Sequence, residues 1–369
     1  MSLDWYTLVN PEEVPSPALL VYRDRIEGNL RRMIEIAGGP SRLRPHIKTH
    51  KIAELITRQL ELGISRFKCS TIAEAELTAN AGCRDILVAL QPVGPNVRRA
   101  IELVKRFPGS RFMFLADNSH VVRELSSAAT EAHARIELLV DLDVGQHRTG
   151  MQPGAPALDL ARLISSQPGL GFGGLHAYDG HIHDSDLVTR SLSCELSFSP
   201  VTSLRDTLAR RGLQVPRIVA GGTPTFPIHI KRGDVECSPG TCVLWDAGYA
   251  RKLPDLDFQP AAVILSRVIS RPGTSRICLD LGHKAVASEM NPPRMTFLNL
   301  SDAVPIAHNE EHLVLESPRA ESFAVGDVIY AIPWHICPTV ALHQEVWVVD
   351  EHRAGARWTV AARDRRITI

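Results

Sequence analysis

The sequence predicts an α/β protein, a (β/α)8 barrel followed by a mainly antiparallel β domain, and three observations lead to this prediction. Short apolar runs alternate with amphipathic helical patterns over the first two thirds of the chain, as in parallel βαβ units. Polar side chains capable of chemistry stand at the ends of these runs, on the face where barrel enzymes build their sites. After about residue 255 the runs become short and closely spaced, which is typical of antiparallel strands.

Eight apolar runs are expected to form the barrel strands. They cover residues 16–22, 43–49, 66–71, 85–91, 111–117, 135–144, 170–178 and 217–223. Amphipathic periodicity predicts helices over 52–62, 73–81, 97–107 and 157–165. The same alternation would fit an open doubly wound sheet, but a count of eight favours the barrel. We therefore expect a barrel domain over 15–254 and a β domain over 255–369, with residues 1–14 adding a strand to the second.

The composition describes a globular protein without an obvious macromolecular partner. Lys plus Arg and Asp plus Glu are equal at 41 each, so electrostatics gives no reason to expect nucleic acid or an anionic membrane. No apolar run is long enough to span a bilayer, and the N-terminus has no secretory pattern. The seven cysteines have no framework spacing, which favours a reducing compartment. We therefore expect a cytoplasmic protein that acts on a small molecule.

Lys48 is the first candidate for chemistry, in the segment RPHIKTHK at residues 44–51. On an extended strand, alternation puts His46, Lys48 and His50 on one face. A lysine in a barrel mouth is costly unless it is used or paired, and burial lowers its pKa so that the amine can act as a nucleophile. The spacing alone is also compatible with a solvated basic strand end.

Gly221, Gly222 and Thr223 follow the predicted strand RIVA. Consecutive glycines let the backbone approach an anion closely, and the threonine can add its hydroxyl and cap a following helix. The pattern is therefore a candidate phosphate cradle. It lacks the Walker and dinucleotide-binding motifs, so a plain turn between strand and helix remains an alternative.

Arg148 lies just beyond another apolar run, in VDLDVGQHRTG. An arginine there could face a cofactor ring nitrogen or bind a substrate carboxylate. A salt bridge with Asp141 or Asp143 is the alternative interpretation.

The segment LHAYDGHIHD, residues 175–184, is dense in groups that can move protons. Its three histidines, His176, His181 and His183, suit general base work or metal binding at a strand end. A loop with incidental histidines would have the same composition.

His335 and Cys337 form an H-x-C pattern in the predicted β domain. In a strand, this spacing puts the imidazole and the thiol on one face, where both can bind one ion. Nitrogen with sulfur favours Zn²⁺ over harder ions, and two protein ligands leave positions open, as in a catalytic site. A buried strand cysteine is the ordinary alternative.

Several motifs occur in one order: R-P-H-x-K-T-H-K, V-G-x-x-R-x-G, H-x-Y-x-G-H, G-G-T-P-T, P-G-T, D-L-G-x-K-A and P-x-H-x-C-P-T. With them the sequence resembles the D-threonine aldolase / D-serine dehydratase family, over about residues 15–350. The fold of that family is similar to that of alanine racemase, and its members are fold type III pyridoxal-phosphate enzymes. The resemblance also implies a homodimer.

The resemblance assigns roles by motif position. Lys48 would be the Schiff-base lysine and Arg148 would face the pyridine nitrogen of the cofactor. Tyr178 and the Gly221-Gly222-Thr223 turn would hold the phosphate. His335 and Cys337 would hold a divalent metal, with Zn²⁺ preferred and Mn²⁺ or Mg²⁺ as alternatives.

The implied activity is that of a lyase on D-amino acids with a β-hydroxyl group. We expect the aldolase reaction, which yields glycine and an aldehyde, because His181 or His183 offers a base in addition to Lys48. The dehydratase reaction, which yields a 2-oxo acid and ammonia, is the alternative, and Cys337 resembles the dehydratase branch. A racemase is favoured less, since it has no need of a metal at the β-hydroxyl. A non-catalytic cofactor carrier would not need the H-x-C pair.

Overall fold

The computed structural model describes residues 3–369, which divide into two compact units. The barrel unit consists of Met33–Lys48, Ala53–Gly240 and Asp364–Ile369. The β unit consists of Met1–Arg32, Thr49–Ile52 and Thr241–Arg363. Each unit is built around its own sheet and is described by itself.

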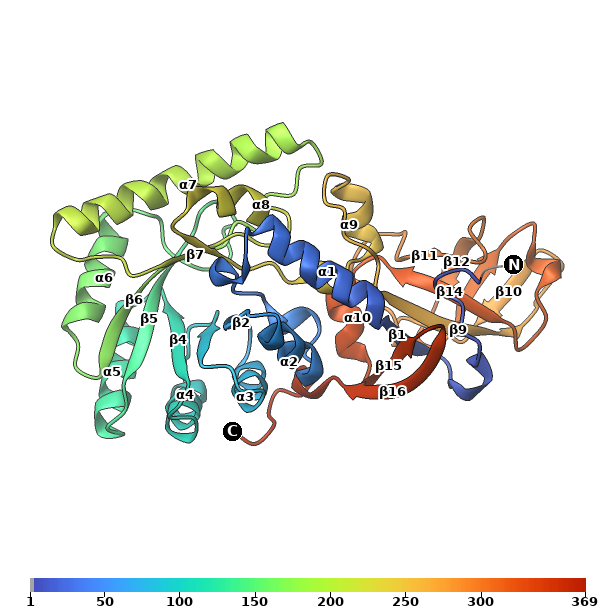
Figure 1. Cartoon of the computed structure of the whole chain (residues 1–369), viewed down its shortest axis with the longest axis horizontal. Coiled ribbons are helices and arrows are strands. Elements are labelled where there is room, and N and C mark those ends of the chain that lie inside the picture. Colours follow the sequence, from blue (N-terminus) through green and yellow to red (C-terminus); the bar gives the residue numbers. More distant parts are fainter. Residues whose placement is uncertain (1–2) are drawn as a thin grey trace. The chain divides into compact units, whose positions relative to one another are not determined.

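The barrel unit contains a parallel sheet of seven strands in chain order (Figure 1). They are β2 (Arg66–Cys69), β3 (Asp85–Val88), β4 (Arg111–Ala116), β5 (Ile136–Leu142), β6 (Leu170–Ala177), β7 (Ile218–Ala220) and β8 (Val235–Cys237). Residues 43–46 connect its two edges, because Leu43 forms a parallel bridge to Cys237 and His46 to Lys68. These residues take the place of an eighth strand, and the predicted fold class is confirmed.

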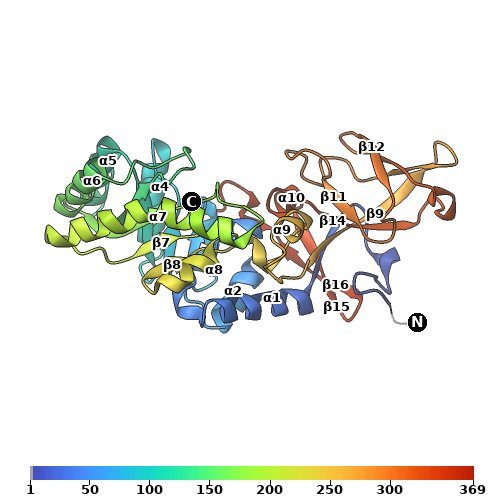
Figure 2. The same cartoon turned by 90° about the horizontal axis from the view of Figure 1, so that it is seen from above.

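Helices follow the strands around the outside of this sheet (Figures 1 and 2). They are α2 (Ala53–Glu61), α3 (Ile72–Asn80), α4 (Pro95–Arg106), α5 (Ser119–Glu131), α6 (Ala155–Ser166), α7 (Leu187–Arg210) and α8 (Phe226–His229). Short 3-10 turns are η2 (Pro40–Arg42), η3 (Ile47–Thr49) and η4 (Ile230–Arg232). Among the described residues, no helix combines the length and apolarity needed to cross a membrane.

The interior of the barrel is filled by side chains. Five fully or nearly fully buried residues from β3, β4, β5 and β7 form one apolar cluster: Leu87, Met113, Leu115, Leu139 and Val219. Layers of branched and long apolar side chains of this kind close the centre of a parallel barrel. The sheet is therefore a packed core, and chemistry is confined to its edges.

The β unit contains a mixed sheet of nine strands, antiparallel except where β1 pairs with β15. They are β1 (Ala18–Tyr22), β9 (Ala262–Ser270), β10 (Arg276–Leu279), β11 (Met295–Phe297), β12 (Val304–His308), β13 (Leu313–Glu316), β14 (Val328–Pro333), β15 (Glu345–Asp350) and β16 (Arg353–Thr359). Its helical elements are η1 (Pro11–Glu13), η5 (Thr241–Val243), α9 (Ala247–Lys252), η6 (Ala320–Ser322), α10 (Ile336–Leu342) and η7 (Ala361–Arg363), and α1 (Arg23–Ile36) follows β1. Strands β9, β11 and β14 lie side by side in Figure 2.

The structure differs from the sequence prediction in four respects. The run 16–22 is β1 of the β unit, where it pairs with β9 and β15, and the barrel strand β8 was not predicted. All five residues of β1 are buried, so its apolar run cannot be distinguished from a barrel strand by periodicity. Residues 3–14 add no strand, and within them Pro11–Glu13 form the 3-10 turn η1. The units also change at Gly240, whereas we expected a boundary at residue 254.

Arg44 ties the closing segment 43–46 to the sheet. Its side chain is fully buried, and its Nε lies 2.7 Å from a carboxylate oxygen of Glu236 in β8. A terminal nitrogen lies 2.7 Å from Asp85 in β3. A buried cation is tolerated only when it is paired in this way.

We predict that Arg44→Ala lowers the free energy of unfolding of the barrel unit by about 3 kcal/mol, because it leaves two partly buried carboxylates without their cation. Hydrogen exchange of peptides from β2, β3 and β8, followed by mass spectrometry, measures this unit separately. The matched control is Arg58→Ala, which removes an exposed pair with Glu61 on α2 and should change the stability by less than about 0.5 kcal/mol. Equal effects of the two substitutions would contradict the prediction.

Candidate functional site

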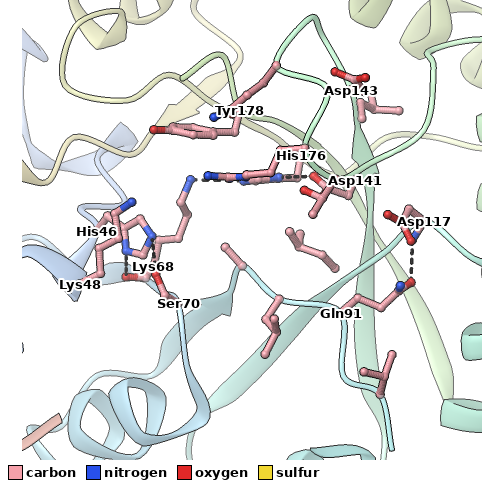
Figure 3. A pocket seen from close by; sticks show the side chains of 18 residues that line it. His46, Lys48, Lys68, Ser70, Gln91, Asp117, Asp141, Asp143, His176 and Tyr178 are labelled. Atoms are coloured by element: carbon pink, nitrogen blue, oxygen red, sulfur yellow. Dashed lines mark hydrogen bonds and ion pairs between the residues drawn. The ribbon is translucent and has the colours of Figure 1, made fainter. Parts of the chain in front are cut away.

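The ends of the parallel strands surround a cavity of about 450 Å³ in the barrel unit (Figure 3). Its wall includes Lys48, Arg148 and Tyr178, all of which were expected at this face of the sheet. The wall also includes His176 from β6, one of the three histidines considered for general base work or metal binding, and Lys68 from β2, which was not predicted. Most of the polar residues that follow the strands are therefore brought together.

Lys48 reaches the cavity from a turn and not from a strand. The sheet pairing ends at His46, and Ile47–Thr49 form the 3-10 turn η3. The predicted alternation therefore fails after Lys48. His50 belongs to the β unit, where it is buried and its Nδ1 accepts a hydrogen bond from the backbone N–H of Ile52. Burial and the charge of Lys51 lower the pKa of His50 to about 3.

Three cations surround the ring of Tyr178. The Nζ of Lys48 lies 6.0 Å from the ring centroid, and the Nζ of Lys68 lies 5.3 Å from it. The guanidinium carbon of Arg148 lies 5.3 Å away. Cations are attracted to the face of an aromatic ring at such distances. The ring therefore holds positive charge around one side of the cavity.

Arg148 does not form the salt bridge that we considered as its alternative role. The carboxylate of Asp141 accepts a hydrogen bond from His176 at 2.7 Å. The carboxylate of Asp143 accepts from the backbone N–H of His147 at 3.0 Å and lies 2.8 Å from its ring. Both acids have other partners, so Arg148 remains available to a ligand in the cavity.

The glycine turn packs against Tyr178. Gly221 has φ of 74°, a left-handed conformation that favours glycine. A Cβ at Gly222 would lie only 3.2 Å from the Cε2 atom of Tyr178, so the ring and the backbone approach each other closely. Thr223 accepts a hydrogen bond from the backbone N–H of Gly240 at 3.1 Å. The predicted turn is therefore a tight backbone loop beside the ring.

Ser238 offers a hydroxyl at the same loop. Its backbone N–H donates to the carbonyl of Gly221 at 3.1 Å, and its side chain is buried. Within the described part of the chain, its Oγ has no hydrogen-bond partner. Buried polar groups without a partner are rare in folded proteins. An anion at the glycine loop would give Ser238 the partner that it lacks.

A buried network supports the loop from behind. Asp179 accepts a hydrogen bond from Thr225 at 2.9 Å, and Thr225 accepts one from the backbone N–H of Gly222 at 3.2 Å. The Nε2 atom of His229 lies 2.8 Å from Asp179 and 3.1 Å from the thiol of Cys194. These three groups could hold a metal by geometry, but burial raises the pKa of Cys194 to about 12, so its thiol keeps its proton. We interpret the cluster as hydrogen-bonded support.

The three histidines of the segment 175–184 lie in different places. His176 lines the cavity, whereas His181 and His183 do not. His183 is exposed, and the Nε2 of His181 lies against Gly145, 3.5 Å from Ser197. The catalytic roles of His181 and His183 therefore stay predictions. Of the three histidines, His176 is the one that lies inside the predicted strand 170–178, and this position distinguishes it in the sequence.

Lys68 was not among the predicted site residues, although its place in the sequence indicates an unusual charge. It is a charged residue between Phe67 and Cys69 in a short apolar run. Its Nζ lies 3.2 Å from the Nε2 of His176 (Figure 3). Alternation along the run indicates which face Lys68 takes, but only the packed barrel shows that this face opens to the cavity.

His335 and Cys337 lie in the β unit, and the predicted strand there is wrong. His335 is the N-cap of α10, and Cys337 lies in its first turn. The two side chains are nevertheless hydrogen-bonded, because the first turn brings them together. The thiol lies 3.3 Å from the hydroxyl of Thr49, and His335 contacts Glu289. Burial opposes protonation, but Cys337 and Glu289 raise the pKa of His335 to about 9.

A parallel barrel with cations and a glycine loop at the ends of its strands is typical of an enzyme that binds an anionic cofactor or substrate. Residues 21–245 match the protein family "Alanine racemase, N-terminal domain", and residues 261–349 match the "Putative serine dehydratase domain". The D-threonine aldolase of an Arthrobacter species is 31% identical, over 95% of this chain and 93% of that protein. The D-threo-3-hydroxyaspartate dehydratase of a Delftia species is 28% identical, over 88% of this chain and 92% of that protein.

The crystal structure of D-threonine aldolase from Filomicrobium marinum has a similar fold, with a TM-score of 0.89 and 27% identity over 98% of this chain and 99% of that one. The chain therefore belongs to the D-threonine aldolase / D-serine dehydratase family, whose fold is that of alanine racemase. Pyridoxal phosphate is the cofactor expected of this family. The relatives are lyases, of both the aldolase and the dehydratase type.

We predict that Ser238→Ala has opposite effects on stability and on anion binding. The ligand-free protein should be as stable as the unaltered one or more so, because a buried hydroxyl without a partner is removed. Pyridoxal phosphate should bind about tenfold more weakly, which corresponds to one lost hydrogen bond of about 1.4 kcal/mol. Thermal unfolding with and without the cofactor, and titration calorimetry, measure the two effects. Unchanged affinity would exclude Ser238 from the phosphate site.

Proposed function

We propose that this protein is a lyase that depends on pyridoxal phosphate and a divalent metal and cleaves D-β-hydroxy-amino acids into glycine and an aldehyde. The observation that carries the proposal is the group of Lys48, Arg148 and Tyr178 around one cavity, with the glycine loop packed on Tyr178. The 31% identity with a D-threonine aldolase over nearly the whole chain supports this reaction type.

The residues present fit the cofactor. Lys48 would hold it covalently through its amine, and Arg148 would face the ring nitrogen as a cation that keeps this nitrogen unprotonated. Tyr178 and the loop Gly221–Thr223 would bind the phosphate, and the free hydroxyl of Ser238 suits the same group. When bound, pyridoxal phosphate stabilises negative charge at the α-carbon of an amino acid.

The residues of the β unit fit a divalent metal. His335 and Cys337 supply nitrogen and sulfur side by side, a donor pair that favours Zn²⁺, with Mn²⁺ or Mg²⁺ as alternatives. Two protein donors leave positions for water or substrate, as expected of a catalytic ion. Such an ion lowers the pKa of a hydroxyl that it contacts.

The protein must also move a proton from the β-hydroxyl. We assign this to His181 or His183, and of the two we favour His181. Its Nδ1 is buried and, among the described residues, has no hydrogen-bond partner, so it can accept a proton. His183 is exposed, and water would compete for its nitrogens.

The dehydratase reaction is the second candidate, and a specific observation favours it. A D-threo-3-hydroxyaspartate dehydratase of a Delftia species is 28% identical to this chain. By its motif, Cys337 also resembles the dehydratase branch of the family. In that reaction the amine of Lys48 would take the α-proton, and the hydroxyl group would leave as water. A racemase would use the same lysine but has no need of His335 and Cys337.

We also propose that the protein is a homodimer and that it is cytoplasmic. The dimer rests on the family resemblance. The compartment rests on the seven cysteines, whose scattered positions in the sequence have no disulfide framework spacing.

With pyridoxal phosphate and Zn²⁺ or Mn²⁺, the purified protein should convert D-threonine to glycine and acetaldehyde. Amino-acid analysis and an alcohol dehydrogenase assay measure the two products. L-Threonine and the variant Lys48→Ala serve as controls and should give neither product. Pyruvate from D-serine, together with no glycine from D-threonine, would reject the aldolase in favour of the dehydratase.

We predict that Cys337→Ala weakens Zn²⁺ binding at least tenfold, because half of the protein donor pair is lost. Metal analysis after equilibrium dialysis measures the change. Cys278→Ala is the matched control, since this buried cysteine lies in β10 of the same unit and should leave the metal content unchanged. If Cys337→Ala also leaves it unchanged, the metal site lies elsewhere.

A further inference from the structure

The cavity contains a second lysine that neither the motifs nor the proposed function uses. Lys68 lies in β2 with only 3% of its surface exposed, and it lines the cavity together with Lys48. Figure 3 shows its side chain extending toward His176, with the ring of Tyr178 beside both. A buried amine at a site needs a role or a counter-charge.

Lys68 is the outer member of a three-residue chain of hydrogen bonds. Asp141 accepts from the Nδ1 of His176 at 2.7 Å, which assigns the imidazole proton to Nδ1. The Nε2 of His176 then carries a lone pair and accepts from the Nζ of Lys68 at 3.2 Å. A neutral amine can make this bond with one of its hydrogens. Its own lone pair then stays free for a group in the cavity.

The charges around Lys68 keep its proton exchangeable. The charged groups that act on its amine are Arg44, Lys48, Asp141 and Asp179, and the imidazole of His176 is hydrogen-bonded to it. His46 and Arg148 line the same cavity. Burial is the main influence, and the charge of Lys48 adds to it, so the pKa of Lys68 falls to about 7. Asp141 and Asp179 act in the opposite direction and prevent a larger fall. Ammonium and amine are therefore both populated near neutral pH.

We propose that Lys68 is a catalytic acid of this site, which protonates the α-carbon of the glycine product; this rests on the proposed aldolase function. Breaking of the Cα–Cβ bond leaves its electron pair at the α-carbon. The ammonium of Lys68 gives one proton to that pair, so that an N–H bond breaks and a C–H bond forms. The neutral amine then takes a proton from water. In the reverse direction, the neutral amine removes an α-proton from glycine.

His176 and Asp141 are positioning residues in this proposal. Their hydrogen bonds fix the direction of the Lys68 amine and leave its protonation state free to change. Lys48 would be needed to hold the cofactor between turnovers, whereas the Lys68 amine has no such task and keeps its place beside His176. The two lysines therefore have separate tasks in one cavity.

The first test measures the protonation of Lys68 directly. The chain has only seven lysines, so the side-chain amines of protein labelled with ¹³C and ¹⁵N on lysine can be assigned by NMR. With pyridoxal phosphate bound, the signal lost in Lys68→Arg should titrate near neutral pH. The signal of the exposed Lys105 on α4 serves as the reference in the same titration. An ordinary value for Lys68 would overturn the proposal.

The second test follows exchange of the glycine α-proton with D₂O, with cofactor bound and no aldehyde present. Lys68→Met should slow the exchange by about 100-fold or more while the cofactor absorbance is retained. Lys68→Arg keeps a cation but cannot release its proton, so it should be equally slow. Lys105→Met should exchange at the unaltered rate. Normal exchange in Lys68→Arg would show that only the charge matters and would overturn the proposal.

The two proposals can fail separately. Lys68-dependent exchange without cleavage of D-threonine would reject the aldolase and leave Lys68 as the proton-transfer residue. Cleavage of D-threonine with unchanged exchange in Lys68→Met would reject the role of Lys68 alone. Absence of both reactions in the unaltered protein would reject both.

Discussion

The ring of Tyr178 is the contact on which the candidate site depends. One part of it lies so close to Gly222 that no Cβ fits there without a shift, and three cationic side chains lie within 6.0 Å of its centroid. The ring therefore contacts both the backbone of the glycine loop and the cationic side chains of the cavity. A larger residue at Gly222 would displace the ring. This would change the cation–π contacts of the ring with Lys48, Lys68 and Arg148.

The barrel unit accommodates several buried ionisable groups by giving each a different kind of partner. Arg44 is matched by two carboxylates and can only be a cation, so its role is structural. Asp179 is held as a carboxylate: burial raises its pKa, but hydrogen bonds from His229 and Thr225 lower it by more. Among the described residues, the side chain that is hydrogen-bonded to Lys68 is a neutral imidazole, so no carboxylate binds its amine directly. Of these three groups, Lys68 has the weakest compensation and lines the cavity, as expected where ionisation serves chemistry.

The sequence predicted the barrel, the β domain and three residues of the cavity wall, because these depend on local patterns and on the order of motifs. It failed where the outcome depends on packing. The run 16–22 is as apolar as a barrel strand, and only its pairing with β9 and β15 assigns it to the other sheet. His335 and Cys337 are adjacent in space although they start a helix, so the spacing gave the right neighbours for the wrong reason. Ser238 and His229 could not be predicted, since neither lies in a pattern that points to the glycine loop.

The choice between the two lyase reactions depends on which proton moves first, and the arrangement of bases bears on it. A dehydratase needs one base at the α-carbon and an acid for the departing hydroxyl, and Lys48 alone could serve the first need. An aldolase needs a base for the hydroxyl and, afterwards, an acid for the α-carbon. The cavity supplies a second amine that can hold or lose a proton near neutral pH, and its imidazole partner fixes its direction without fixing its charge. In our proposal, Lys68 is the acid that carbon–carbon cleavage requires, and Lys48 holds the cofactor.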